Sequence, residues 1–294
     1  MSERVRLHAP AKVNLGLRIL ARRSDGYHEL ESLFVPLDLG DALSLEIVRA
    51  DAPRVTLHVE PKGSGAPDDP SNLAVRAALL FMEMARLALH VDIALEKRTP
   101  VAAGLGGGSS DAGAVLRSLA TFEPGALEPA ALHALALRLG ADVPYFLDPR
   151  PAWVRGIGER IEPAKGVPAL ALVLAGPREP LATREVYRVY DVLHTEPGRT
   201  PADAPVELPA SWEDGVLLGR LLHNDLEPAA VRLCPAVRRL RTELAGRGAL
   251  AVGMSGSGPT VFGVFGSLAA ARAAALRPLA TPGWQRVAST KESG

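Results

Sequence analysis

Hydrophobic and polar residues alternate near the start of the chain with the two-residue period of a strand. In residues 11–20, Val13, Leu15, Leu17 and Ile19 share one face, and Lys12, Asn14, Gly16 and Arg18 share the other. Lys12 and Asn14 are therefore predicted to project side by side. A polar strand face turned to solvent would explain the same pattern.

The same reading predicts more strands in the first half. They are expected at 33–37, 43–47 and 55–59, in a sheet that is antiparallel, with Gly40-Asp41 joining the first two. A tight turn at residues 24–26 presents Tyr27 and His28, a pair that is also common on partly buried surfaces.

Helical spacing and turn signals divide the remainder of the chain. Pro149-Arg150-Pro151 marks a break that predicts two domains, 1–150 and 151–294. Because strands and helices interleave without strict alternation, the fold class is α+β.

We expect a loop in solvent at 195–209 and a break ahead of Pro235. The predicted helices are 71–89 (capped by Ser71), 112–120, 129–139 (closed by Gly140), 183–193, 215–222, 227–244 and 268–276, and the further strands are 91–95, 153–159, 170–174, 249–254, 260–265 and 284–288.

A glycine-rich stretch from Pro100 to Ala114 lies between a predicted strand and a predicted helix. Its main-chain amides can converge on a bulky anion at the start of the helix, and phosphate is the expected ligand. The stretch is neither a Walker A loop, because Ser109 stands where lysine is needed, nor a dinucleotide-binding fingerprint, because its last glycine is missing. A flexible surface turn is the alternative.

Composition restricts the class of protein. The 294 residues are 47% hydrophobic and contain 33 Lys plus Arg and 33 Asp plus Glu. With no net charge we expect no nucleic-acid or membrane partner. A single cysteine, Cys234, excludes an internal disulfide, and neither a signal peptide nor a membrane-spanning stretch is visible. A cytoplasmic protein is the expectation.

One acidic residue stands among apolar neighbours. Asp142 follows the predicted helix 129–139 and precedes Val143-Pro144-Tyr145-Phe146. A carboxylate in such surroundings needs a partner, because burying an unpaired charge is costly. Asp142 is thus a candidate for chemistry, or else the cap of a neighbouring helix.

Several separated segments together resemble the GHMP kinase superfamily, from the first strand into the C-terminal half. The signature is a lysine-bearing first strand (Ala9 to Leu15), a glycine-rich loop (Pro100 to Asp111) and a Gly-Ser-Gly turn (Ser255 to Gly258). Further matching segments are Asp25 to Leu30, Gly140 to Pro144, Gly156 to Glu159 and Asn224 to Glu227.

The resemblance implies two α+β lobes with the active site in the cleft between them. It implies an enzyme that uses ATP and Mg²⁺ to phosphorylate the 2-hydroxyl of a small-molecule substrate, a diphosphocytidyl methylerythritol, in isoprenoid precursor synthesis. Asp142 and Lys12 would be the catalytic pair, the metal ligands are unknown, and no oligomeric state is predicted. ATP would lie on Pro100, Val101, Ala102, Ala103, Gly104, Leu105, Gly106, Gly107, Gly108, Ser109 and Ser110, and the substrate on Asn14, Tyr27, His28, Thr183 and Tyr187.

Two other functions remain open at this point. One is another small-molecule kinase of the superfamily, of the homoserine or mevalonate type, which the segments at residues 25–30 and 224–227 disfavour. The other is a non-catalytic nucleotide-binding or RNA-binding protein, which the zero net charge and the presence of both Lys12 and Asp142 disfavour.

Overall fold

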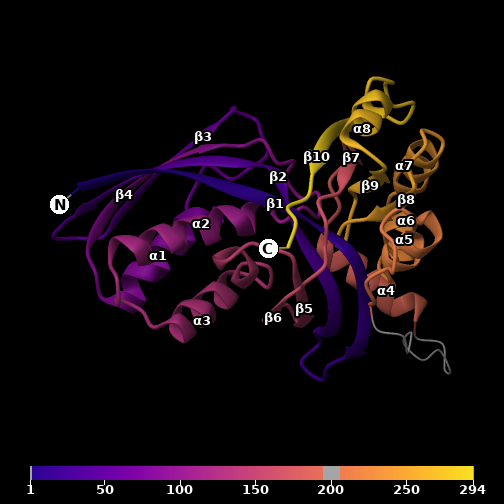
Figure 1. Ribbon diagram of the computed structural model, residues 1–294. Coiled ribbons are helices and arrows are strands. Elements are labelled where there is room, and N and C mark those ends of the chain that lie inside the picture. The colour runs from indigo at the N-terminus through magenta and orange to yellow at the C-terminus, as the bar shows by residue number, and fades with distance from the viewer. Residues whose placement is uncertain (1, 195–205, 294) are drawn as a thin grey trace. The chain divides into compact units, whose positions relative to one another are not determined.

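The computed structural model describes residues 2–194 and 206–293 (Figure 1). The chain falls into two compact units. Both units mix helices and strands, which confirms the α+β class. The first unit comprises residues 1–11, 39–101 and 106–149, and the second comprises 12–38, 102–105 and 150–294. The chain therefore crosses between the units several times, and residue 150 is one of the crossing points. The predicted glycine-rich loop contributes residues to both units.

Two long strands, β1 (Ser2–Arg22) and β2 (His28–Arg49), pair with each other and each contributes to both units. The prediction of two strands joined by a turn at Gly40 is wrong, because β2 runs through without a break. A side chain at position 40 would collide with the main chain of Ala9 and Pro10. Glycine at this position therefore permits two backbones to approach closely, and no turn forms.

In the first unit, β4 (Leu89–Glu96) pairs antiparallel with β2 and parallel with β3 (Arg54–Glu60). The antiparallel prediction for 33–37, 43–47 and 55–59 is thus wrong, because the first two segments lie in one strand and the third pairs parallel with β4. The reason is α1 (Leu73–Ala85), which connects β3 to β4, since a helical crossover returns the chain in the same direction. Along β4, buried and exposed residues alternate strictly, as predicted.

The helices of the first unit lie along one face of these strands (Figure 1). The hydrophobic core of the unit is formed by side chains from both the helices and the strands. The cap of α1 is Asn72, whose Oδ1 accepts the N–H of Ala74 at 2.9 Å, so the assignment of the cap to Ser71 is wrong. The helix ends at Ala85, four residues before the predicted end, because Arg86 has a left-handed backbone. Three helical segments complete the unit: α2 (Gly107–Phe122), α3 (Pro129–Leu139, as predicted) and the short 3₁₀ helix η1 (Pro144–Leu147).

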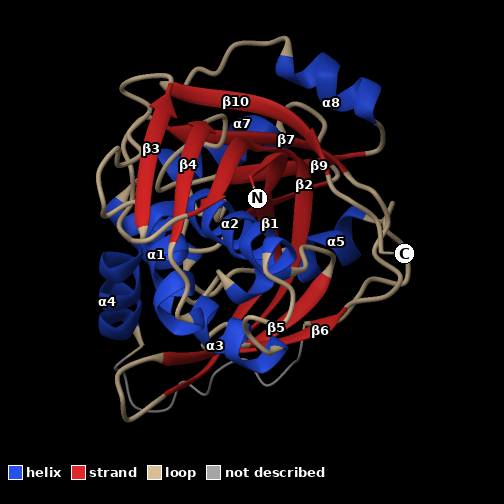
Figure 2. Cartoon of the chain, turned by 90° about the vertical axis from the view of Figure 1, so that its left-hand side faces the viewer, coloured by secondary structure: helices blue, strands red, loops and turns tan. Residues whose placement is uncertain are grey.

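The second unit contains an antiparallel sheet in the order β10 (Gly283–Ser289), β7 (Ala171–Pro177), β9 (Val261–Phe265) and β8 (Ala251–Met254). Of these, β10 and β7 are seen side by side in Figure 2. Residues 30–34 of β2 pair with β5 (Ala152–Gly156), which pairs with β6 (Arg160–Pro163), a strand the sequence did not predict. The helices are α4 (Thr183–Leu193), α5 (Gly215–Leu221), α6 (Glu227–Leu233), α7 (Ala236–Ala245) and α8 (Leu268–Ala275).

Most helix predictions in this unit are confirmed, including the break ahead of Pro235 between α6 and α7. The predicted solvent loop at 195–209 lies mostly outside the described residues. Its described end does not agree with the prediction, because Val206 is buried and donates its N–H to Glu31 Oε2 at 2.9 Å. Within the described part of the chain, no helix combines the length and apolar character that crossing a membrane requires.

Candidate active site

Lys12 and Asn14 form a buried polar pair on β1. The Nζ atom of Lys12 donates a 2.6 Å hydrogen bond to Asn14 Oδ1, as the predicted side-by-side projection requires. Only 3% of Lys12 and 2% of Asn14 is exposed, which excludes the solvated strand face. Asn14 Nδ2 donates to Ser32 Oγ on β2 at 2.8 Å, and the Lys12 ammonium lies 4.4 Å from the centre of the Phe34 ring. Both long strands thus hold the lysine head in one place.

The Gly-Ser-Gly turn between β8 and β9 brings several predicted site residues together in the second unit. Gly256 has a positive φ of 57°, and a Cβ atom there would lie 3.3 Å from Asn14 Oδ1 and 3.5 Å from Lys12 Nζ. Ser255 Oγ donates to Gly104 O at 2.9 Å, and Ser257 Oγ lies 2.8 Å from Thr183 Oγ1 at the start of α4. The turn therefore contacts the lysine, the glycine-rich loop and a predicted substrate residue.

The main chain of β1 adds a further connection to the loop. The N–H of Lys12 donates to Leu105 O at 2.9 Å, and the N–H of Thr260 donates to Ala103 O at 3.4 Å. Residues 102–105 of the glycine-rich loop are thus fixed between β1 and the segment that follows the Gly-Ser-Gly turn. This arrangement is not that of a flexible surface turn.

Asn224 supports this turn, a role that the sequence did not reveal. Its Nδ2 donates to Met254 O at 2.9 Å and to Gly256 O at 2.8 Å, and its Oδ1 accepts the N–H of Leu226. Asn224 is buried, and the main chains of its neighbours His223 and Asp225 bond to Leu17 on β1. The signal available in the sequence was that Asn224 lies in a segment, Asn224 to Glu227, that resembles the kinase superfamily. Its contact with the turn could not be predicted, because that contact depends on tertiary structure.

His28 is held within an aromatic group on the second unit. Its Nε2 lies 2.6 Å from Asp191 Oδ1, and its ring centre lies 4.9 Å from that of Tyr187 and 5.8 Å from that of Tyr190. The structure thus brings His28 and Tyr187 together, whereas Tyr27 is 60% exposed. Asp191 and Tyr190 were not identified from the sequence.

The first unit supplies the start of α2. The earliest hydrogen bond of this helix runs from the N–H of Ser110 to Gly106 O at 2.8 Å. The amides of Gly107, Gly108 and Ser109 precede it and meet no carbonyl of their own helix. They form the kind of helix start that binds phosphate. The helix begins five residues before the predicted residue 112, because the glycine-rich stretch itself supplies its first turn.

A buried cluster of three charged residues, Asp41, Lys97 and Asp111, lies beside this helix start. Lys97 Nζ donates to Asp111 Oδ2 at 2.9 Å and also to Asp41 Oδ2. Burial raises the pKa of Asp111 to about 7; the Lys97 charge opposes this shift and the Asp41 charge adds to it. For Lys97, burial lowers the pKa, but the two carboxyl groups outweigh it and the pKa is raised. No functional role of Asp41, Lys97 or Asp111 was evident from the sequence.

Asp142 lies in the first unit, between α3 and η1, and is partly buried. The pKa of Tyr145 is raised well above its usual value, first by burial and then by the charges of Asp142 and Asp148. Lys12 belongs to the second unit, so the roles of Asp142 and Lys12 as a pair stay predictions.

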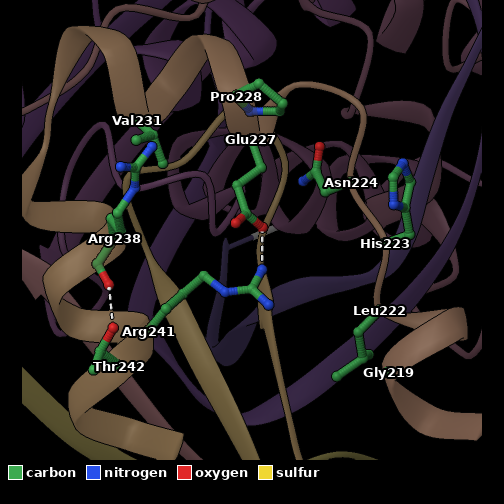
Figure 3. A pocket seen from close by; sticks show the side chains of 10 residues that line it. All are labelled: Gly219, Leu222, His223, Asn224, Glu227, Pro228, Val231, Arg238, Arg241 and Thr242. Carbon is green, nitrogen blue, oxygen red and sulfur yellow. Dashed lines mark hydrogen bonds and ion pairs between the residues drawn. The ribbon is translucent and has the colours of Figure 1, made fainter. Parts of the chain in front are cut away.

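A surface cavity of about 420 Å³ in the second unit is lined by residues of α5, α6 and α7 and of the segment between α5 and α6 (Figure 3). An ion pair between Glu227 and Arg241 crosses it. None of the predicted site residues lines it, although Asn224 does. Among the described residues, no three His, Cys, Asp or Glu side chains are grouped so that they could hold a metal ion.

Two segments of the chain match domains of one kinase family. Residues 72–148 match the GHMP kinases N terminal domain, and residues 207–279 match the GHMP kinases C terminal domain. A 4-diphosphocytidyl-2-C-methyl-D-erythritol kinase of Anaeromyxobacter dehalogenans (strain 2CP-C) is 49% identical over 91% of this chain and 83% of its own length. A kinase of the same name from Rhizobium etli is 42% identical over 97% of this chain and 94% of its own.

Solved structures give the same result. A crystal structure of 4-(cytidine 5′-diphospho)-2C-methyl-D-erythritol kinase superimposes with a TM-score of 0.79 at 39% identity, covering 97% of this chain and 99% of the other. A homoserine kinase from Cytophaga hutchinsonii has a TM-score of 0.68 at 21% identity, covering 98% and 95%, a likeness of fold alone.

Proposed function

The chain belongs to the GHMP kinase family, and on that premise we propose that it phosphorylates the 2-hydroxyl of 4-diphosphocytidyl-2-C-methyl-D-erythritol, with ATP as donor, in isoprenoid precursor synthesis. Relatives that bear this substrate in their names cover almost the whole chain at 39–49% identity. The structural observation that carries the proposal is the Gly-Ser-Gly turn, where Lys12, Asn14 and Gly104 converge.

Phosphoryl transfer requires alignment and charge neutralisation more than covalent chemistry from the protein. The free amides at the start of α2 and the positive end of its dipole would bind the donor's phosphates. In our proposal Asp142 accepts the proton of the acceptor hydroxyl, and Lys12 lowers the pKa of that hydroxyl. The hydrogen bond from Lys12 to Asn14 supports the second role, because it fixes the direction of the ammonium.

Mg²⁺ fits the residues that are present, although no acidic cluster is found among those described. Protein-bound Mg²⁺ commonly keeps waters and substrate phosphates as most of its ligands. Ser110 Oγ is buried at the start of α2 and has no hydrogen-bond partner within the described structure, so it is the side chain we assign to the ion. When bound, Mg²⁺ neutralises phosphate charge.

We assign binding of the cytidine group of the substrate to His28 and the tyrosines. Stacking on Tyr187 would favour any base, at about 1–3 kcal/mol per base. Choice of cytosine therefore needs hydrogen bonds to the base edge, and His28 is our candidate. Because Asp191 occupies Nε2, the nitrogen offered to a base would be Nδ1. Asn14 and Thr183, which flank the Gly-Ser-Gly turn, are proposed to contact the sugar alcohol.

A substrate panel tests the function. Purified protein with ATP and Mg²⁺ would be given 4-diphosphocytidyl-2-C-methyl-D-erythritol, homoserine or mevalonate, and ADP release and the phosphorus NMR spectrum of the product would be recorded. We expect turnover with the first compound alone and a new phosphomonoester on its 2-oxygen. Turnover confined to homoserine or mevalonate would show the alternative kinase, and RNA binding without ADP release would show the non-catalytic alternative.

A further inference from the structure

The cavity of about 420 Å³ in the second unit is bounded by α5, α6, α7 and the segment between α5 and α6 (Figure 3). All of its lining residues belong to that unit. Pockets that hold small molecules commonly have volumes of about 300–1,000 Å³. The residues predicted to bind ATP or the substrate are not among those that line it. A ligand bound here would therefore be one that the proposed function does not account for.

Two arginines of α7 give the cavity its positive charge. Arg238 and Arg241 are three positions apart, so they lie on the same face of the helix, and both line the cavity. In Figure 3 the side chain of Arg241 reaches toward Glu227, the acidic residue of the lining, and forms an ion pair with it. The guanidinium group of Arg238 has no hydrogen bond or ion pair with the described residues. Two guanidinium groups thus stand against one carboxylate.

The neighbouring charged groups do not neutralise Arg238. His223 lines the cavity, but its Nε2 lies 2.7 Å from Asp225 Oδ1, so this ring is already paired with an acid. Glu243, the acidic residue of α7, does not line the cavity, and its carboxylate accepts the N–H groups of residues 280–281 at 2.9 Å each. The positive charge of Arg238 is therefore left to a ligand.

Apolar residues form another part of the lining. Leu222, Pro228 and Val231 contribute to it, and Leu222 is otherwise buried. At Gly219, on α5, a Cβ atom would meet no other atom within 4 Å, so the cavity is open beside this residue. A ligand that fits these surroundings has an apolar part as well as a negative charge, since binding pockets combine apolar walls with a few polar groups.

The geometry of arginine selects the kind of anion. Each guanidinium group is a planar fork of N–H donors that matches the oxygen atoms of carboxylate or phosphate. A carboxylate has two oxygens and fills one such fork, whereas a phosphomonoester has three terminal oxygens for the two arginines. Arg241 has donors to spare, because a guanidinium group carries five N–H bonds and its NH1 nitrogen alone donates to Glu227.

We propose that this cavity is a binding site for a small organic phosphate. Arg238 and Arg241 bind the phosphate group, and Leu222, Pro228 and Val231 contact the apolar part. The proposal goes beyond the proposed function and does not depend on it, because none of the predicted ATP-binding or substrate-binding residues takes part.

Binding of phenyl phosphate, measured by calorimetry without nucleotide, tests the charge. Arg238→Gln should weaken binding about tenfold or more, because charge-assisted hydrogen bonds are lost. Arg239→Gln removes the same charge from the next residue of α7, which is exposed and does not line the cavity, and should bind as wild type. Equal affinities in the two variants would overturn the proposal. Inorganic phosphate should bind severalfold more weakly than phenyl phosphate, and equal binding would overturn the apolar contact.

A second pair of variants tests the space without changing any charge. In Gly219→Leu the new side chain should occupy the cavity and abolish binding of phenyl phosphate, whereas Gly219→Ala should leave room for the ligand. Both substitutions suit a helix better than glycine does, so the fold should persist, which the melting temperature would show. Wild-type affinity in Gly219→Leu would exclude the cavity as the binding site.

Chemical modification places the ligand. Phenylglyoxal reacts with accessible arginines, and mass spectrometry reports the rate at each position. Phenyl phosphate should slow the modification of Arg238 and leave that of Arg239 unchanged. Binding without protection of Arg238 would show that the ligand lies elsewhere and overturn the proposal. Because no kinase activity is measured, protection of Arg238 in a protein without ATP turnover would leave this inference standing and count against the proposed function alone.

Discussion

The ammonium of Lys12 is held by the side-chain amide of Asn14 at 2.6 Å, and both residues are buried on the same strand. Asn14 is itself fixed by Ser32, which donates to Gly16 O. The lysine head therefore has a direction that is set before any substrate binds. Such preorganisation matters because misplacing a reacting group by about 1 Å can cost about 100-fold in rate.

Removing the amide should release the lysine. In Asn14→Ala we expect kcat to fall about 100-fold. Ser32→Ala, which removes only the contact behind the amide, should cost less. Steady-state kinetics with ATP and the diphosphocytidyl substrate measures kcat for both variants. A larger fall in kcat for Ser32→Ala than for Asn14→Ala would contradict the view that Ser32 acts on Lys12 through Asn14.

The proposed catalytic pair predicts two severe variants. Asp142→Asn and Lys12→Ala should each lower kcat by about 100- to 10,000-fold, the usual range for losing a positioned proton acceptor or its partner. Circular dichroism and melting temperature would show that the fold persists. Near-normal turnover in either variant would refute its role.

The cytosine assignment predicts a change in selectivity. In His28→Ala the preference for the cytidine substrate over its uridine analogue, measured as the ratio of kcat/KM values, should fall roughly tenfold, because a hydrogen bond to the base edge is lost. Asp191→Asn should lower the same ratio less, since it alters only how the ring is held. An unchanged ratio in His28→Ala would exclude this residue from base recognition.

The contacts of Asn224 predict that replacing this residue lowers both the stability of the fold and the turnover. Asn224→Ala leaves the carbonyl groups of Met254 and Gly256 without their donor, at a cost of about 1–3 kcal/mol for each unsatisfied buried group. Chemical denaturation measures the stability, and kcat should fall because Gly256 packs on Lys12 and Asn14. The exposed change Glu213→Ala serves as control, and a variant as stable as that control would exclude the supporting role.

The lowered pKa of Asp225 predicts that the protein loses stability in acid. Burial alone would raise its pKa, but hydrogen bonds from His223 and the Ile19 N–H, with the charges of His223 and Arg18, leave the pKa lowered. A lowered folded pKa contributes stability that is present above the unfolded value of about 3.9 and is lost as pH falls through the folded value. The melting temperature of wild type should thus exceed that of Asp225→Asn at pH 6, and the difference should shrink toward pH 3. A constant difference would show that the carboxylate does not act through its charge.

Local patterns in the sequence were sufficient for most helices and strands. The strict alternation in β4 and the proline and glycine that bound α3 depend on a few neighbouring residues, which is why β4 was predicted as a strand and the bounds of α3 were found. The prediction at Gly40 was wrong because glycine is found both in turns and where two backbones approach closely. Only the neighbouring strand, which is not visible in the local sequence, decides between the two. The parallel pairing of β3 with β4 likewise follows from how α1 returns the chain.

For the site, the sequence alone determined the chemical types: a lysine beside an asparagine, a glycine run that is expected to bind phosphate and an acid among apolar residues. Tertiary structure decided which distant residues complete them. Asn224 supports Gly256 across 32 positions, and Lys97 meets Asp41 across 56. No local period or spacing encodes such contacts, because the packing of separate elements creates them. Burial then decides which of these groups hold their charge and which take up a proton.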